Sequence, residues 1–341
     1  MKKILIVLSI LLLTAFLWQI LLPVSSDSNE VVFRIEKGEG SRDIALNLQE
    51  EGLIRWGPMF RLYVLLTASA GELQAGTYSL SESMNIPRIT GKFVNGEVIR
   101  EKLTVIEGWN LKNIGYYLEN KGIFQAEEFW EVAGFPATDY LQATDLPKPK
   151  DFSSEYSFLE SKPDNVGLEG FLFPDTYEVN MEEKVEDVVR KMLDNFDQKL
   201  TLQLREEISK QGKTIFDIVT MASILEREVQ TKEDKEIVSG IFWKRMKLQK
   251  PLESCATIAY IKGVDQWRYS FEDTRTMSLY NTYLNYGLPL GPISNPGMDS
   301  ILAAIYPKST EYLYYLSTPE GETIFSKTFE DHSRAKAEYL E

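Results

Sequence analysis

A long apolar run opens the chain. Ile4–Leu22 comprises nineteen residues without a charge, and Lys2 and Lys3 precede it. At 1.5 Å of rise per residue such a helix is about 28 Å long, close to the hydrocarbon thickness of a bilayer. Because positive charges stay on the cytoplasmic side, we expect residues 1–22 to form a cytoplasmic tip and a single transmembrane anchor, with the rest of the chain on the extracytoplasmic side of the cell membrane. A cleaved signal peptide ending near Val24 is the alternative.

Beyond a polar spacer at 23–30, the pattern changes to short alternating and helical segments. Residues 31–106 are typical of a small α+β unit. The expected strands are 31–36, 76–80 and 98–106, and the expected helices are 41–50, 58–68 and 86–94. Residues 107–166 follow as a connection, with two helices and then a loop rich in Pro, Ser, Asp and Lys, which favours a domain boundary.

The remaining residues, 167–341, mix helices with a hairpin. Periodicity predicts helices at 182–211, 214–230 and 237–248, an ordered loop at 280–297, a hairpin at 312–326 and a terminal helix after Thr328. The expected fold class is therefore α+β, with an N-terminal single transmembrane helix, a small α+β subdomain and a larger mixed α/β domain.

Composition narrows the chemistry. Lys and Arg number 37 against 51 Asp and Glu, so the net charge is −14 and the pI is near 4.8, which argues against nucleic acid as a partner. A single cysteine, Cys255, and a single histidine, His332, exclude an internal disulfide, a multi-cysteine zinc site and any site that needs two imidazoles. We therefore expect no metal and no organic cofactor, and acid–base chemistry must rest mainly on carboxylates.

One carboxylate lies on the apolar side of its predicted helix. Projected at about 100° per residue, the apolar residues of 214–230 fall within an arc of roughly 120°, and Glu226 falls inside that arc. A carboxylate in apolar surroundings is poorly hydrated, which favours its protonated form. A group that holds a proton near neutral pH suits a general acid, so Glu226 is the leading catalytic candidate. The alternative is a buried glutamate paired with an arginine or lysine, or one at the rim of the apolar face.

Three further segments combine aromatic rings with carboxylates, amides and hydroxyls, as sugar-binding surfaces do. Residues 167–177 contain Glu169, Asp175 and Tyr177, residues 280–283 contain Tyr280, Asn281 and Thr282, and the loop 287–297 contains Asn295. Packing or turn geometry is an alternative explanation for each segment taken alone.

Together these segments resemble the YceG-like family of endolytic peptidoglycan transglycosylases. The similar stretches are 168–177, 221–228, 280–283 and 287–297, followed by the hairpin and His332. The resemblance implies that Glu226 is the catalytic acid, that 31–106 is a LysM-like subdomain and that 167–341 is the catalytic domain. It implies a lyase that cuts the β-1,4 bond between N-acetylmuramic acid and N-acetylglucosamine in nascent strands. The products would carry 1,6-anhydro ends, and strand elongation would stop close to the synthases.

Residues 252–257 depart from the family pattern. Many relatives have Leu-Gln-Ser-Asp-Pro-Thr where this chain has Leu-Glu-Ser-Cys-Ala-Thr, so the subsite detail there is open. The predicted substrate-binding residues are Glu169, Asp175, Tyr177, Glu253, Ser254, Tyr280, Asn281, Thr282 and Asn295.

The implied reaction needs one carboxylate rather than two. Glu226 would protonate the glycosidic oxygen, and the C6 hydroxyl of the same sugar would attack C1 and return a proton to Glu226. Two rival functions stay open. A hydrolytic muramidase would need a second carboxylate to activate water, such as Glu228, Asp175 or Glu169. A non-catalytic scaffold would bind peptidoglycan and recruit synthases without using Glu226.

Overall fold

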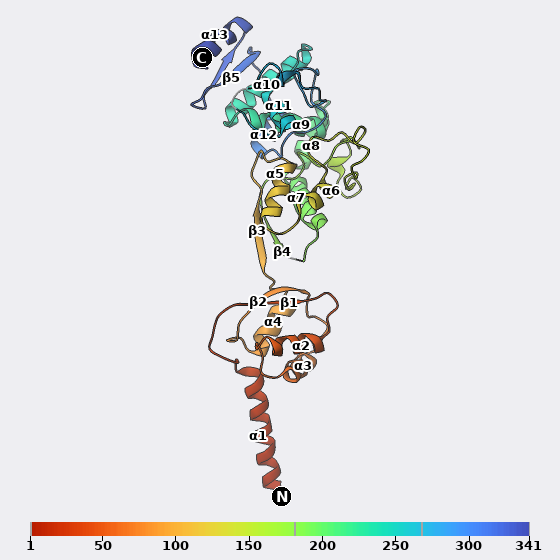
Figure 1. The fold of residues 1–341 in the computed structure, drawn as a ribbon, viewed down its shortest axis with the longest axis vertical. Coiled ribbons are helices and arrows are strands. Elements are labelled where there is room, and N and C mark those ends of the chain that lie inside the picture. Colours follow the sequence, from red (N-terminus) through yellow and green to blue (C-terminus); the bar gives the residue numbers. More distant parts are fainter. Residues whose placement is uncertain (1, 181, 267–268, 341) are drawn as a thin grey trace. The chain divides into compact units, whose positions relative to one another are not determined.

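The computed structural model describes residues 2–180, 182–266 and 269–340, which divide into two compact units (Figure 1). One unit comprises Met1–Lys102 with Glu178–Glu183, and the other comprises Leu103–Tyr177 with Lys184–Glu341. Strands β3 (Arg100–Thr104) and β4 (Thr176–Asn180) pair with each other, and the division falls inside both strands. Helices and small two-stranded sheets together confirm the predicted α+β class.

The smaller unit is built on an antiparallel pair of strands. Its elements besides the N-terminal helix are β1 (Val31–Ile35), α2 (Ser41–Glu50), α3 (Gly57–Leu66), β2 (Gly76–Leu80) and α4 (Ile86–Asn95). Alternation along β1 and β2 buries Phe33 and Tyr78, which lie opposite each other in the register. Both rings pack on Phe93 of α4, at centroid distances of 5.8 and 4.7 Å, so the helices cover one face of the strand pair.

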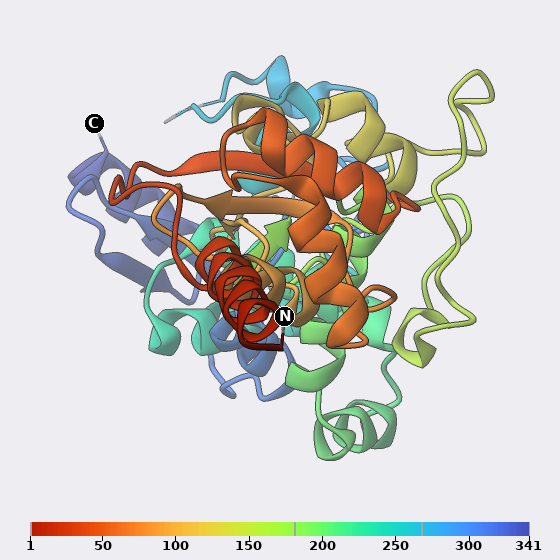
Figure 2. The ribbon, with the colours of Figure 1, turned by 90° about the horizontal axis from the view of Figure 1, so that it is seen from below.

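Helix α1 (Lys2–Leu21), seen along its axis in Figure 2, forms where the sequence predicts the anchor. Its C-terminal end is fixed to the smaller unit, because Arg55 donates to the carbonyl of Leu22 at 2.9 Å and its guanidinium lies 4.5 Å from the centroid of the Trp18 ring. Among residues 2–180, 182–266 and 269–340, no helix combines the length and the apolarity needed to cross a membrane. Several side chains of the predicted anchor, including those of Leu5 and Leu12, lie outside the described part.

The larger unit is mainly helical. Its elements are α5 (Leu111–Asn120), α6 (Ala126–Ala133), the 3-10 helix η1 (Ser157–Leu159), α7 (Val185–Lys199), α8 (Leu202–Lys210), α9 (Ile215–Glu228), α10 (Lys232–Lys247), α11 (Cys255–Lys262), η2 (Asp273–Arg275), α12 (Met298–Ile305), the hairpin β5 (Tyr314–Ser317) and β6 (Thr323–Ser326), and α13 (Phe329–Tyr339).

Helix α9 lies at the centre of this unit. It begins with the predicted capping box, in which Thr214 accepts from the Asp217 N–H at 3.0 Å and Asp217 accepts from the Thr214 N–H at 2.9 Å. Helices α8, α10, α11 and α12 all pack against it, so every residue from 218 to 225 is buried. The most enclosed helix of the unit therefore ends at the pair of glutamates, Glu226 and Glu228.

The predicted helix at 182–211 is wrong in one respect, because the structure has two helices there. Helix α7 ends at Lys199, and Thr201 then caps α8 by accepting from the Leu204 N–H at 3.5 Å. A threonine side chain that caps a new helix competes with continuation of the old one.

Candidate active site

Glu226 lies in the last turn of α9, where three donors surround its carboxylate. The Nζ of Lys235 donates to Oε1 at 2.9 Å. The backbone N–H of Gly297 and the hydroxyl of Ser300 donate to Oε2 at 2.9 and 2.7 Å. The side chains of Lys235 and Glu226 are only 6% and 8% exposed, so the ion pair is nearly enclosed.

Two neighbouring helices bring these donors to Glu226. Thr231 caps α10 by accepting from the Asp234 N–H at 3.1 Å, which places Lys235 in the first turn of α10 and beside the end of α9. Gly297 is the residue that precedes α12, and Ser300 lies in the first turn of that helix. Because α10 and α12 pack on α9 and on each other, the three donors converge on one carboxylate.

This environment differs from the apolar surroundings predicted by the helical projection. The alternative interpretation, a buried glutamate paired with a lysine, describes the geometry, because Lys235 is the ion-pair partner. A buried ammonium group at hydrogen-bond distance favours the charged form of a carboxylate. Glu226 is therefore held by one ion pair and two further hydrogen bonds.

Glu107 is a second carboxylate at this site, and the sequence analysis did not single it out. Its carboxylate rests against Gly297: a Cβ atom at Gly297 would overlap Oε1 and lie 2.8 Å from Oε2. In the described part of the chain, no hydrogen bond reaches this carboxylate. Burial raises the pKa of Glu107, and the charge of Glu226 raises it further. The charges of Lys235 and Asp299 act in opposite directions, lowering and raising it.

Asn295 fixes the segment that carries Glu107 beside the segment that carries Gly297. Its backbone N–H donates to the carbonyl of Trp109 at 2.7 Å, and its carbonyl accepts from the N–H of Gly108 at 2.9 Å. Its amide nitrogen also donates to the Trp109 carbonyl, at 3.0 Å. The residue is fully buried, so these contacts align two loops in the interior of the unit.

Glu169 lies in the same buried network. Its two oxygens accept from the N–H of Leu111 at 3.1 and 3.0 Å, and they also accept from the Tyr260 hydroxyl at 3.1 Å and the Asn295 amide at 3.2 Å. Burial raises the pKa of Glu169 to about 8, although the hydrogen bonds oppose that shift. The carboxylate joins α5, α11 and the loop of Asn295.

Glu228 holds the start of α11. Its Oε1 accepts from the hydroxyl of Ser254 and from the N–H of Ala256, the latter at 3.1 Å, and its Oε2 accepts from the Tyr315 hydroxyl at 2.8 Å. Ser254 is itself held from behind, because its N–H donates to the hydroxyl of Thr282 at 3.0 Å. Both oxygens of Glu228 are therefore occupied by structural contacts.

The other predicted binding residues lie in separate contacts. Glu253 forms an ion pair with Arg245, Asn281 donates to the carbonyls of Thr274 and Thr276, the Tyr280 ring packs 5.1 Å from that of Tyr260, and Asp175 and Tyr177 both accept from Asn195. Within the described residues, no side chain of the nine predicted substrate-binding residues bonds to Glu226. Their contact with substrate stays a prediction.

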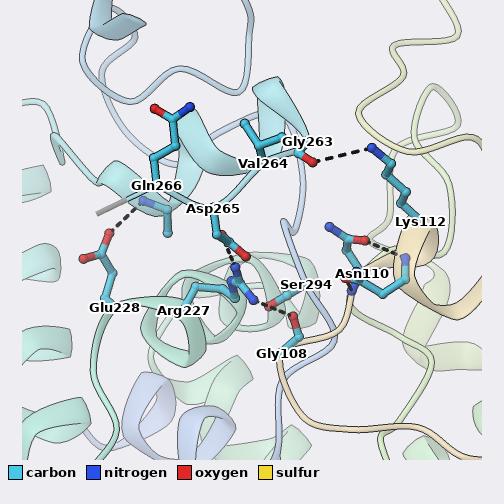
Figure 3. A network of polar contacts seen from close by, with 12 residues as sticks. Gly108, Asn110, Lys112, Arg227, Glu228, Gly263, Val264, Asp265, Gln266 and Ser294 are labelled. Atoms are coloured by element: carbon cyan, nitrogen blue, oxygen red, sulfur yellow. Dashed lines mark hydrogen bonds and ion pairs between the residues drawn. The ribbon is translucent and has the colours of Figure 1, made fainter. Parts of the chain in front are cut away.

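A polar cavity of about 110 Å³ opens beside Arg227, the residue after Glu226. Amide, cationic and tyrosine side chains line it, among them Asn110, Lys112 and Tyr260. In Figure 3 the guanidinium of Arg227 points toward Asp265 and the carbonyl of Gly108, and the two are its ion-pair and hydrogen-bond partners. Hydroxyl-rich ligands fit such a lining. Among the side chains described, no group of three or more His, Cys, Asp or Glu is placed to hold a metal ion.

Comparisons with known proteins agree on one family. The profile of the YceG-like family matches residues 33–338. A Bacillus subtilis protein named endolytic murein transglycosylase is 30% identical over 331 residues, which cover 96% of this chain and 90% of that protein. A Streptococcus pneumoniae protein of the same name is 29% identical over 94% of this chain, which spans only 60% of the pneumococcal protein. A crystal structure of a yceG-like protein from Listeria monocytogenes aligns with a TM-score of 0.58 and 28% identity, covering 91% of this chain and all of that chain. The chain therefore belongs to the YceG-like family.

Proposed function

We propose that this protein is an endolytic murein transglycosylase. It cleaves the β-1,4 bond between N-acetylmuramic acid and N-acetylglucosamine within nascent peptidoglycan strands, without water, and leaves 1,6-anhydro ends. The names of the Bacillus and Streptococcus relatives support this activity, as does a family match over most of the chain. The observation that carries it is the enclosed Glu226 carboxylate with its three donors.

Glu226 is the catalytic carboxylate of this proposal. The C6 hydroxyl belongs to the sugar whose C1 it attacks, so the nucleophile is tethered and its effective concentration is high. A carboxylate held by Lys235, Gly297 and Ser300 is placed to accept the proton of that hydroxyl. This scheme uses no water as nucleophile and calls on no cofactor.

Two finer features concern the N-terminal part. The first is a membrane anchor at α1, with a cytoplasmic N-terminus and the catalytic unit on the other side. The uncharged run Ile4–Leu22 supports it, as do exposed apolar side chains such as Ile4 and Leu11. The second is a LysM-like subdomain within 31–106, which the order β1–α2–α3–β2 supports. Sedimentation of the full chain with lipid vesicles, compared with a chain lacking residues 1–27, tests the anchor.

The biological consequence would be termination of strand elongation. An enzyme that cuts nascent strands internally acts where strands are made, so peptidoglycan synthases are the expected protein partners. Cross-linking in cells, followed by identification of the captured proteins, tests this part separately from the chemistry.

The decisive experiment uses the full chain in detergent with uncrosslinked peptidoglycan strands. Wild type, Glu226→Gln and the control Glu228→Gln are incubated in parallel, and the products are analysed by mass spectrometry. We expect internal fragments one water lighter than reducing-end sugars from wild type and from the control, and none from Glu226→Gln. Reducing-end products would instead establish the hydrolytic muramidase. Strand binding without cleavage by wild type would favour the non-catalytic scaffold.

A further inference from the structure

More than one carboxyl group lies at the site of Glu226, although the proposed reaction requires only one. The charges of two other carboxyl groups, Glu226 and Asp299, and of the Lys235 ammonium group act on Glu107. The next cation, Arg227, is paired with Asp265 and donates to the carbonyl of Gly108 at 3.4 Å. A neighbouring carboxylate charge disfavours the ionised form of Glu107.

The surroundings of Glu107 and Glu226 differ in the way that an acid and a base should differ. Glu226 accepts three hydrogen bonds, one of them from an ammonium group. Glu107 accepts none from the residues described, and it lies against the Cα of Gly297, the residue whose N–H donates to Glu226. The same glycine therefore holds the two carboxyl groups next to each other.

Gly297 is needed for this arrangement because it has no side chain. A Cβ atom at that position would occupy the space of the Glu107 carboxylate. The backbone of Gly297 has φ −77°, which any residue adopts, so conformational freedom does not explain the glycine. Close approach of Glu107 explains it. Glu107 as a whole residue is exposed, so it lies at the surface of the larger unit.

We propose that Glu107 is the proton donor of the reaction and that Glu226 is its proton acceptor. This inference rests on the proposed transglycosylase function and divides between two residues the roles that one residue would otherwise play in turn. The carboxyl group of Glu107 gives its proton to the glycosidic oxygen as the bond from that oxygen to C1 breaks. The C6 oxygen forms a new bond to C1, and its proton passes to the Glu226 carboxylate. The proton then returns from Glu226 to Glu107, so the cycle consumes no water.

The charge environment agrees with this division. Because burial and the charge of Glu226 both raise the pKa of Glu107, it retains a proton at higher pH than an ordinary glutamate does. A general acid is most effective when its pKa lies near the working pH.

The test compares two substrates that differ in their need for an acid. One is the natural uncrosslinked strand, whose sugar alkoxide must be protonated as it leaves. The other is an aryl β-glycoside of the N-acetylglucosamine–N-acetylmuramic acid disaccharide, whose phenolate leaves without a proton. Full-length wild type, Glu107→Gln, Gly297→Ala and Glu226→Gln are assayed on both, with Glu119→Gln of α5 as an exposed carboxylate control. Circular dichroism checks that each variant is folded.

We expect Glu107→Gln to slow strand cleavage at least about 100-fold and to turn over the aryl substrate within about five-fold of wild type. Gly297→Ala should show the same selectivity in weaker form, because its methyl group displaces the Glu107 carboxylate. Glu226→Gln should cleave neither substrate, and Glu119→Gln should cleave both at the wild-type rate. The rate of wild type on strands should fall as the pH rises and Glu107 loses its proton, whereas Glu107→Gln on the aryl substrate should lack that fall.

Equal losses on the two substrates in Glu107→Gln, or no loss on either, would overturn the inference. The proposed function has a separate readout, since wild type that yields reducing ends is a hydrolase whatever Glu107 does. The leaving-group comparison still reports on Glu107 in that case. Wild type that cleaves neither substrate would overturn both proposals.

Discussion

The Nζ of Lys235 lies 2.9 Å from Oε1 of Glu226, and both side chains are almost entirely removed from solvent. A buried ion pair of this kind costs desolvation energy that the mutual attraction only partly recovers. The ion pair joins the end of α9 to the first turn of α10. Two further donors from the start of α12 fix the orientation of that carboxylate.

Lys235→Met tests the ion pair. Removal of one member of a buried pair leaves the other charge without compensation and costs about 3–5 kcal/mol. We expect the free energy of unfolding, measured by urea denaturation, to fall by about 3 kcal/mol. In the double variant Lys235→Met/Glu226→Gln the loss should shrink to about 1 kcal/mol, because no unpaired charge remains. Losses that simply add in the double variant would show that the two side chains are not coupled.

Glu228→Gln tests whether the second glutamate of α9 takes part in the reaction. Both oxygens of Glu228 are engaged by Ser254, Ala256 and Tyr315. We expect the amide to keep part of this cap, to lower stability by about 1 kcal/mol and to change neither the product nor the rate by more than about three-fold. Mass spectrometry and thermal denaturation measure the two effects. A loss of cleavage comparable to that of Glu226→Gln would show instead that Glu228 takes part in the reaction, as the second carboxylate of a hydrolase.

Glu169 predicts a pH dependence of stability. Its pKa is about 8 in the folded protein against an ordinary value of 4.5, so the folded state binds the proton more tightly than the unfolded chain does. The resulting stabilisation is fully present below the ordinary value and is lost as the pH rises through about 8. We expect this part of the unfolding free energy to decline between about pH 5 and pH 8.

The matched variant for this effect is Glu169→Gln, which cannot ionise. It should be less stable than wild type by about 2 kcal/mol at acid pH, because an amide cannot accept from all three donors around this side chain. The difference in unfolding free energy between the two proteins should become smaller toward pH 8, because only wild type contains a group at position 169 that ionises. Parallel curves for the two proteins across this range would contradict the buried, protonated Glu169.

Two glycines inside helices should respond to alanine in opposite directions. A Cβ atom at Gly240 of α10 would overlap the backbone carbonyl of Lys308, whereas one at Gly91 of α4 would meet no atom within 4 Å. We expect Gly240→Ala to destabilise the protein by about 3 kcal/mol through overpacking. Gly91→Ala should stabilise it by about 0.5–1 kcal/mol, as alanine does in a helix interior. Urea denaturation of both variants measures the contrast, and a stable Gly240→Ala would show that the 308 loop does not pack on α10.

Local patterns predicted the central helix well. Residues 214–230 were expected as a helix, and α9 spans Ile215–Glu228 with the expected capping box. The apolar period placed Glu226 among buried positions, and the structure agrees. It could not show that α9 is buried on all sides, because that depends on four other helices. Nor could it tell apolar surroundings from an ion pair, since the partner Lys235 comes from the next helix.

Helices α11 and α12 were not predicted, for a related reason. Neither has a side-chain cap of its own at its N-terminus. Helix α11 is capped by Glu228 from α9, and α12 follows a glycine that ends a loop rich in Gly and Pro. Such short helices depend on tertiary contacts rather than on propensity. The sequence pattern does not indicate Glu107 for the same reason. Its carboxylate lies against Gly297, which is far away in the sequence and adjacent only in the fold.

The bridge between residues 108–109 and Asn295 joins parts of the chain that are far apart in the sequence. Residues 226 and 235 are made well before residues 295–300, yet the site needs Asn295 to hold the Glu107 segment and Gly297 and Ser300 to orient Glu226. A growing chain therefore contains Glu226 and Lys235 before the other two donors to Glu226 exist. The surroundings of Glu226 are therefore a product of the whole fold of residues 107–300 and of no shorter piece of it.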